Sequence, residues 1–232
     1  MAKVSAFSAQ RYIIDDTATE KLRTLLTGSR DETKVITTIN RKFPLSIKDI
    51  RSVCPVELLG ESAWVMPWLT DDAVNYRVAQ LARGNSETAA LGHFDFILWH
   101  RQWIKNKNVD DSLLNHLPVL DFSKKEICVY DSLKTMTSID EDDMDLLRNV
   151  FRKRGGLKDW RETYHVQWRQ KDSVNCGIFV CSAAENEVNK LDVQEEGLTM
   201  TQCRILRRFH GAEMIKNVDE AIRNVDGNTA IF

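Results

Sequence analysis

The segment Gln170-Lys-Asp-Ser-Val-Asn-Cys176-Gly-Ile-Phe-Val-Cys181 joins a polar loop to an apolar stretch at a cysteine. The residues after Gly177 place apolar side chains at helical spacing, so a helix is predicted to begin beside Cys176. A thiol at a helix N-terminus lies at the positive end of the helix dipole, which favours thiolate and lowers the pKa. Gly177 would let a substrate backbone come close, and Gln170 could serve as an oxyanion donor. A buried structural cysteine is nevertheless the more common outcome for such a pattern.

Strands and helices are predicted on both sides of this segment. Residues 163–168 alternate apolar and polar side chains, and the stretches 117–122 and 126–131 flank a polar turn, so all three are predicted strands. Helices are predicted from a Thr17-Ala-Thr-Glu20 capping box, from Asp71 and Asp72 as caps, and over 139–153. Two of the predicted helix faces are Val74, Val78 and Leu81, and Ile215, Val218 and Ile222. This order predicts a mixed α+β domain.

The composition excludes several classes of protein. The chain has 232 residues and a formal net charge of −2, so it lacks the basic excess typical of nucleic-acid-binding proteins. No apolar run reaches the roughly 18 residues that a membrane helix needs, and the N-terminus lacks a signal-peptide core. Five scattered cysteines without a CxxC pair indicate neither zinc nor a disulfide framework. We therefore expect reduced thiols, no metal or cofactor, and a monomer in the nucleus or cytoplasm.

Three ordered motifs resemble those of the ubiquitin-like-protein proteases, the deSUMOylating and deneddylating cysteine peptidases. The nucleophile motif of that family is matched by Gln170, Asn175, Cys176, Gly177 and Phe179. Its Trp-Leu-Asn-Asp motif is matched by Trp68-Leu-Thr-Asp71, and its Tyr-x-Asp-Ser-Leu motif by Val129-Tyr-Asp131-Ser-Leu133. The resemblance covers roughly 62–190. It implies a catalytic domain over 61–232, preceded by an N-terminal extension over 1–60 that packs on it.

The resemblance also implies a papain-like fold, a small mixed sheet flanked by helices, and a role for each matched residue. Cys176 would be the nucleophile, Gln170 the oxyanion donor, and Asp131 the carboxylate that orients a histidine base. Trp68 would cover a tunnel for a side-chain-free Gly-Gly tail. Substrate-binding residues would also include Asp71 and Gly177. The partner would be SUMO or a related ubiquitin-like protein, cleaved after Gly-Gly.

The histidine of the family's His-Trp pair has no clear match. His116 lies nearest, 15 residues before Asp131 (131 − 116), whereas the family places its histidine about two residues earlier. Such a shift along a strand moves the ring by about 6–7 Å. A second interpretation is that about ten residues, including His-Trp, are missing between Val119 and Leu120. A third is that another histidine, such as His165, serves as the base. The alternative function is therefore an inactive relative that binds a ubiquitin-like protein.

Overall fold

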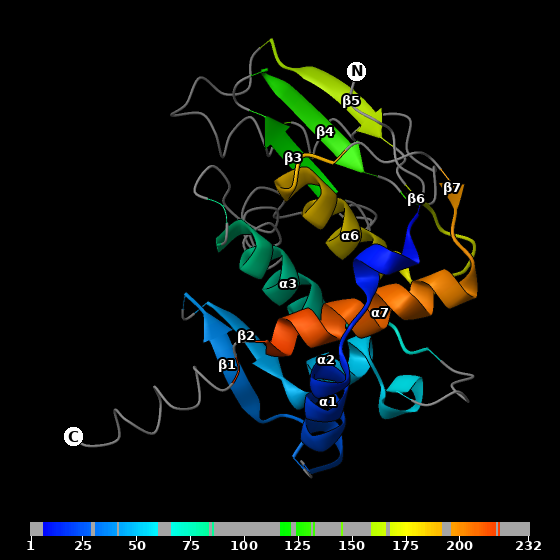
Figure 1. Cartoon of the computed structure of the whole chain (residues 1–232). Helices are drawn as coiled ribbons and strands as arrows, with labels where there is room; N and C mark the ends of the chain where they lie inside the picture. The colour runs from blue at the N-terminus through cyan, green and yellow to red at the C-terminus, as the bar shows by residue number, and fades with distance from the viewer. Residues whose placement is uncertain are drawn as a thin grey trace, which may run out of the picture.

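The structure is a computed structural model, and it describes residues 7–28, 31–40, 42–59, 66–83, 85, 117–121, 124–130, 132, 145, 159–165, 168–191, 196–216 and 218. Its helices are η1 (Ala9–Tyr12), α1 (Asp16–Gly28), α2 (Ile47–Val53), η2 (Val56–Leu59), α3 (Asp71–Arg83), α6 (Cys176–Val188) and α7 (Met200–Ile215). Its strands are β1 (Val35–Ile39), β2 (Phe43–Ser46), β3 (Leu117–Asp121), β4 (Glu126–Tyr130), β5 (Arg161–His165), β6 (Trp168–Arg169) and β7 (Glu196–Gly197). Figure 1 shows α7 crossing the middle of the molecule, between α6 with the β3–β5 sheet and the region of α1 and α2.

The described strands form three small sheets. The largest has the order β3-β4-β5, in which β3 runs antiparallel to β4 and β4 runs parallel to β5. This mixed sheet, together with the surrounding helices, confirms the predicted α+β class. The two strands predicted on either side of the polar turn are β3 and β4. The described residues of the single strand predicted over 163–168 belong to β5 and β6, which lie in different sheets. Pro118 is tolerated in β3 because β3 lies at one edge of the described sheet.

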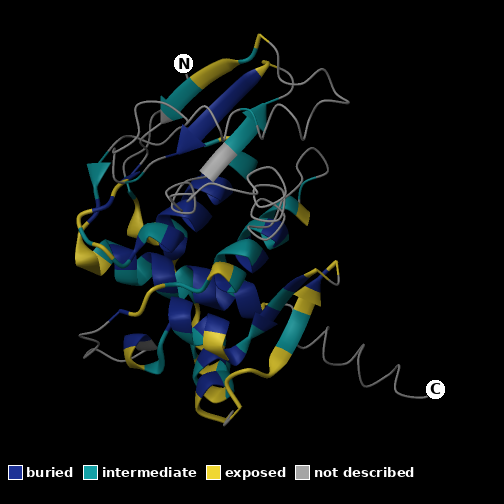
Figure 2. Ribbon diagram, turned by 180° about the vertical axis from the view of Figure 1, so that it is seen from behind, coloured by how far each residue is buried: buried dark blue, intermediate teal, exposed yellow. Residues whose placement is uncertain are grey.

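One hydrophobic core joins the N-terminal quarter of the chain to the last two helices. Its fully buried members include Leu22, Leu26, Leu45, Ile50, Ile178, Leu206 and Met214. Figure 2 shows α6 as largely buried and α7 as a mixture of buried and intermediate residues with an exposed start. Residues 7–59 therefore contribute to the core that holds α6, while the division of the chain at residue 60 stays a prediction. No helix of the described part is long and apolar enough to cross a membrane.

Two helices begin differently from the prediction. In α1 the cap is Asp15, whose Oδ1 accepts a hydrogen bond from the backbone N of Ala18 at 2.6 Å, so the predicted capping box at Thr17 is wrong. In α3 the cap is Thr70, whose Oγ1 accepts from the backbone N of Ala73 at 3.2 Å. The cap thus lies two residues before the predicted Thr17 in α1 and one residue before Asp71 in α3, and in each case its oxygen binds a backbone amide of the first turn.

The buried face of α3 and the extent of α7 also differ from the prediction. The most buried residues of α3 are Ala73, Tyr76, Arg77 and Ala79 rather than the predicted face, because α3 packs against both α6 and β2. The helix with Ile215, α7, begins as far back as Met200 and ends at Ile215, so Val218 lies beyond its last residue. Ile222 and nearly all of 139–153 lie outside the described residues.

Candidate active site

Cys176 differs from the other cysteines in its exposure. All five thiols are free; Cys176 is half-buried, whereas Cys54, Cys128, Cys181 and Cys203 are buried. Cys176 is also the first residue of α6, as the sequence predicts. A nucleophilic cysteine needs access to its substrate, so Cys176 meets a requirement that the other four do not.

The loop before Cys176, residues 170–175, is held by its own side chains. Asp172 Oδ1 accepts hydrogen bonds from the backbone N of Val174 at 2.8 Å and of Asn175 at 2.9 Å. Asn175, which has no exposed surface, donates from Nδ2 to Asp172 Oδ2 at 2.8 Å. Asn175 Oδ1 in turn accepts from Arg207 Nε at 2.7 Å. The backbone just before the thiol is therefore set by buried hydrogen bonds.

Gln170 is buried and uses its side-chain amide within the loop. Its Nε2 donates to the carbonyl O of Asp172 at 2.6 Å and approaches Asp172 Oδ1 at 3.4 Å. Its Oε1 accepts from Ser132 Oγ at 3.1 Å, and its backbone N donates to the Ser132 carbonyl at 2.9 Å. Ser132, the described residue of the Asp131-Ser132 motif, thus contacts the nucleophile loop through Gln170. The predicted role of Gln170 as an oxyanion donor stays a prediction, because both amide hydrogens face Asp172 here.

The pKa of the Cys176 thiol is raised, contrary to the lowering expected from the helix dipole. Burial is the main cause. The backbone N–H groups of Gly177 and Cys176 and the charge of Arg207 act in the opposite direction, whereas the Asp172 carboxylate adds to the increase. Desolvation therefore outweighs the positive end of α6, and a thiolate at neutral pH would need a further base or cation.

The segment Met66–Thr70 lies against the start of α6. Trp68 is 61% exposed, whereas the carbonyl of Pro67 accepts a hydrogen bond from Arg207 and Leu69 packs against the core. A Cβ at Gly177 would lie 3.0 Å from Leu69 Cβ, so the absence of a side chain at Gly177 admits Leu69 of this same chain. Thr70 donates from Oγ1 to Asp49 Oδ1 at 2.6 Å and from its backbone N to Ser52 Oγ at 3.0 Å. Asp71 follows as the exposed first residue of α3.

The histidine and aspartate of the expected triad lie outside the described residues, at His116 and Asp131. Strand β3 nevertheless pairs with β4 in one register, without a bulge, from Leu117 opposite Tyr130 to Asp121 opposite Glu126. His165 is the last residue of β5, which agrees with its interpretation as a strand residue.

The histidine side chain that the structure describes, His210, is occupied elsewhere. It is fully buried; Nδ1 accepts from Arg77 Nε at 3.1 Å, and Nε2 lies 3.0 Å from Ser182 Oγ. Because Nδ1 accepts from arginine, the proton is on Nε2, and the ring cannot take a proton from Ser182. This Ser–His pair is therefore structural.

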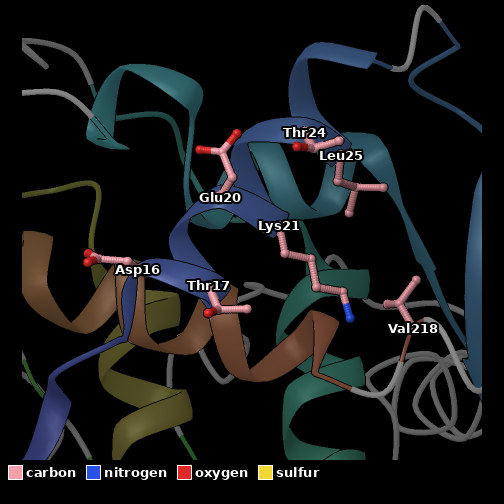
Figure 3. A pocket seen from close by; sticks show the side chains of 7 residues that line it. All are labelled: Asp16, Thr17, Glu20, Lys21, Thr24, Leu25 and Val218. Carbon is pink, nitrogen blue, oxygen red and sulfur yellow. The ribbon is translucent and has the colours of Figure 1, made fainter.

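A separate groove lies along α1. It has a volume of about 700 Å³ and is lined by Asp16, Thr17, Glu20, Lys21, Thr24, Leu25 and Val218 (Figure 3). None of these residues belongs to the nucleophile loop or to the Trp68 segment, and none carries a thiol or an imidazole. The groove is therefore not the candidate active site.

Arg207 is the site residue that sequence reasoning missed. A signal was present, because Cys203, Leu206 and His210 form the buried stripe of α7 and Arg207 falls inside it. An arginine in a buried stripe indicates a charge with internal partners.

Comparison with known proteins identifies the fold. No family model matches the sequence, and no curated protein matches it. Among solved structures, SUMO protease Ulp1 with its catalytic cysteine oxidised to a sulfenic acid is 15% identical, with a TM-score of 0.65, over 88% of this chain and 96% of that chain. The C-terminal Ulp1 protease domain in complex with Smt3, the yeast ortholog of SUMO, is 16% identical with a TM-score of 0.64 and the same coverage. The catalytic domain of a Chaetomium thermophilum Ulp1-like SUMO protease is 13% identical with a TM-score of 0.53, over 93% of this chain and 92% of that chain. The chain therefore has the fold of Ulp1-type catalytic domains.

Proposed function

We propose that this chain is a cysteine peptidase of the ubiquitin-like-protein protease family, which cleaves SUMO or another ubiquitin-like protein after its C-terminal Gly-Gly. The observation that carries the proposal is the position of Cys176. It is the one accessible cysteine of the five, at the first residue of α6, in a chain whose fold is that of SUMO protease domains.

The proposed reaction uses Cys176 Sγ as the nucleophile. Sγ attacks the carbonyl carbon of the terminal glycine, and the oxyanion faces the amide N–H groups at the start of α6. The C–N bond then breaks, so that a thioester forms and the amine leaves with a proton from a general acid. Water hydrolyses the thioester and restores the thiol. His116, oriented by Asp131, is the proposed acid and base.

Two exposed apolar side chains support a surface for the substrate tail. Trp68 is 61% exposed and Met200 is 43% exposed. Met200 lies beside the nucleophile loop, because its Sδ is 3.9 Å from Asn175 Nδ2, and Trp68 follows Pro67, whose carbonyl is bound by Arg207. Exposed aromatic and thioether side chains on the segments that flank the nucleophile loop offer apolar contact area to an extended peptide.

A SUMO C-terminal vinyl sulfone tests the active form. We expect a covalent adduct that peptide mass spectrometry assigns to Cys176 and that is absent in Cys176→Ala. Cys203→Ala, which changes a buried thiol, should still form the adduct. Absence of an adduct under conditions that label a known deSUMOylating enzyme would refute the activity.

The second candidate is an inactive relative that binds a ubiquitin-like protein. It is favoured by the raised pKa of Cys176 and by the absence of a His-Trp pair from the sequence. This candidate predicts measurable binding to SUMO without turnover, and an affinity that Cys176→Ala leaves unchanged. Turnover that is lost in Cys176→Ala would exclude it.

A further inference from the structure

Arg207 is a buried cation with an unusual set of partners. Its side chain has no exposed surface, and within the described residues it forms no ion pair with a carboxylate. Burying a guanidinium costs several kcal/mol unless every N–H finds an acceptor. Burial lowers the pKa of Arg207 to about 10, which leaves the group protonated at neutral pH. The hydrogen-bond acceptors around Arg207 must therefore offset the cost of burying its charge.

All five N–H groups of Arg207 point at acceptors in three separate segments. Nε donates to Asn175 Oδ1 at 2.7 Å. Nη1 donates to the carbonyl of Ser52 at 2.8 Å and approaches that of Val53 at 3.4 Å. Nη2 donates to the carbonyl of Pro67 at 2.8 Å and to that of Val174 at 2.9 Å.

These segments are the parts of the candidate site that must be aligned. Val174 and Asn175 directly precede Cys176, and Pro67 directly precedes Trp68. Ser52 lies in α2, and its hydroxyl also accepts a hydrogen bond from the backbone N of Thr70. A guanidinium is planar and rigid, so acceptors bound to one fork cannot move independently.

We propose that Arg207 is a positioning residue that holds the nucleophile loop and the Trp68 segment in one fixed arrangement, and so sets where Cys176 lies relative to the substrate tail. Its effect on turnover rests on the function proposed above. Its charge has a second consequence, because a cation near the thiol favours thiolate and partly offsets the burial of Cys176 and the nearby Asp172.

The test compares Arg207→Lys with Arg208→Lys on the same helix. Lysine keeps the charge but has three N–H groups on a single nitrogen and no planar fork, so it cannot reach the five acceptors that Arg207 binds. Arg208 is a matched control because the structure records no hydrogen bond from it to the nucleophile loop or to Pro67. The readout is the rate of Cys176 alkylation by iodoacetamide against pH, measured by peptide mass spectrometry on samples whose folding is confirmed by circular dichroism.

Because Arg207→Lys keeps the charge but no longer fixes the loop, the backbone N–H groups of Gly177 and Cys176 should bind the thiolate less well. We therefore expect the alkylation profile to move to higher pH, with a rate about tenfold lower at pH 7.5, which corresponds to one pKa unit. Arg208→Lys should stay within about twofold of the unmodified chain. In turnover assays, Arg207→Lys should lower kcat and raise KM. A folded Arg207→Lys variant whose alkylation profile coincides with that of the unmodified chain would overturn the proposal.

If Arg207→Lys fails to fold, a milder variant tests the same proposal. Asn175→Ala removes one acceptor of the fork and should move the alkylation profile in the same direction; an unchanged profile overturns the proposal. Alkylation requires no peptidase activity. If the SUMO probe never reacts but the profile depends on Arg207, the proposed function fails and the positioning role stands. If the SUMO probe reacts equally fast with Arg207→Lys and Arg208→Lys, the positioning role fails while the proposed function stands.

Discussion

Arg207 Nε donates to Asn175 Oδ1 at 2.7 Å, and this bond ties the last described helix to the residue before Cys176. The two residues are separated by 32 positions in the chain and are both without exposed surface. The candidate nucleophile therefore depends on packing between α6 and α7 as well as on its own loop.

Replacing Trp68 should impair substrate binding without affecting stability. Trp68→Ala removes a side chain that is 61% exposed, so the free energy of unfolding should change by less than about 0.5 kcal/mol. Affinity for SUMO should fall about tenfold or more, as for an aromatic anchor in an interface. Calorimetric binding and urea unfolding measure the two effects. Ile13→Ala, with a side chain that is 63% exposed at a different place in the chain, is the control and should leave affinity unchanged.

Adding one methyl group at Gly177 should destabilise the fold and displace the Trp68 segment. In Gly177→Ala the new Cβ would lie 3.0 Å from both Leu69 Cβ and Val74 Cγ2, and overpacking of this kind costs about 1–3 kcal/mol. Chemical denaturation measures the loss. Gly28→Ala is the matched control, because nothing lies within 4 Å of its added Cβ. Equal stability of the two variants would contradict the packing at Gly177.

A chain that begins at residue 61 should not fold alone. Its core would lack Leu22, Leu26, Leu45 and Ile50, all fully buried. Each large buried side chain contributes about 2–5 kcal/mol, and the total stability of a domain is only about 5–15 kcal/mol. We expect no cooperative thermal transition, whereas the full chain should show one. A cooperative transition in the shortened chain would establish the boundary at residue 60.

Stability should fall as the pH decreases below about 6.5 because of His210. Burial and the charges of Arg77 and Arg11 hold the pKa of His210 well below its ordinary value of 6.5, so the unfolded chain binds the proton first. The contribution of His210 to the free energy of unfolding is complete above pH 6.5. It is lost as the pH falls toward the folded-state pKa, by at most about 1.4 kcal/mol per pH unit. Urea unfolding at pH 7.5, 6.5 and 5.5 measures this slope.

His210→Gln should flatten the acid slope relative to the unmodified chain. Glu185, at 3.9 Å from His210 Nε2, acts in the opposite sense, because burial raises its pKa and its protonation on acidification relieves an unfavourable buried charge. It is present in both proteins, so the difference between the two slopes isolates the histidine. Identical slopes would show that His210 does not titrate on unfolding.

If His116 is the base, His116→Gln should lower kcat by about four to six powers of ten, as loss of a triad member does. His165→Gln tests the alternative histidine. Hydrolysis of a SUMO C-terminal fluorogenic amide measures both. An effect in His165→Gln alone would transfer the role to His165, and no effect in either would favour the binding function.

The sequence alone determined the elements that local patterns encode. The apolar spacing after Gly177 located α6, the alternation on either side of the polar turn located β3 and β4, and three ordered motifs indicated the fold that solved structures confirm. Such patterns suffice because a helix face and a strand face repeat at fixed intervals along the chain.

Only the tertiary structure decided how Cys176 is held and which groups surround it. The helix dipole predicted a lower pKa, but burial among residues distant in sequence raises it. Gly177, predicted to face a substrate, is packed against Leu69. Arg207 reaches the loop across 32 positions. Desolvation and long-range hydrogen bonds depend on which segments meet in space, and no local spacing along the chain contains that information.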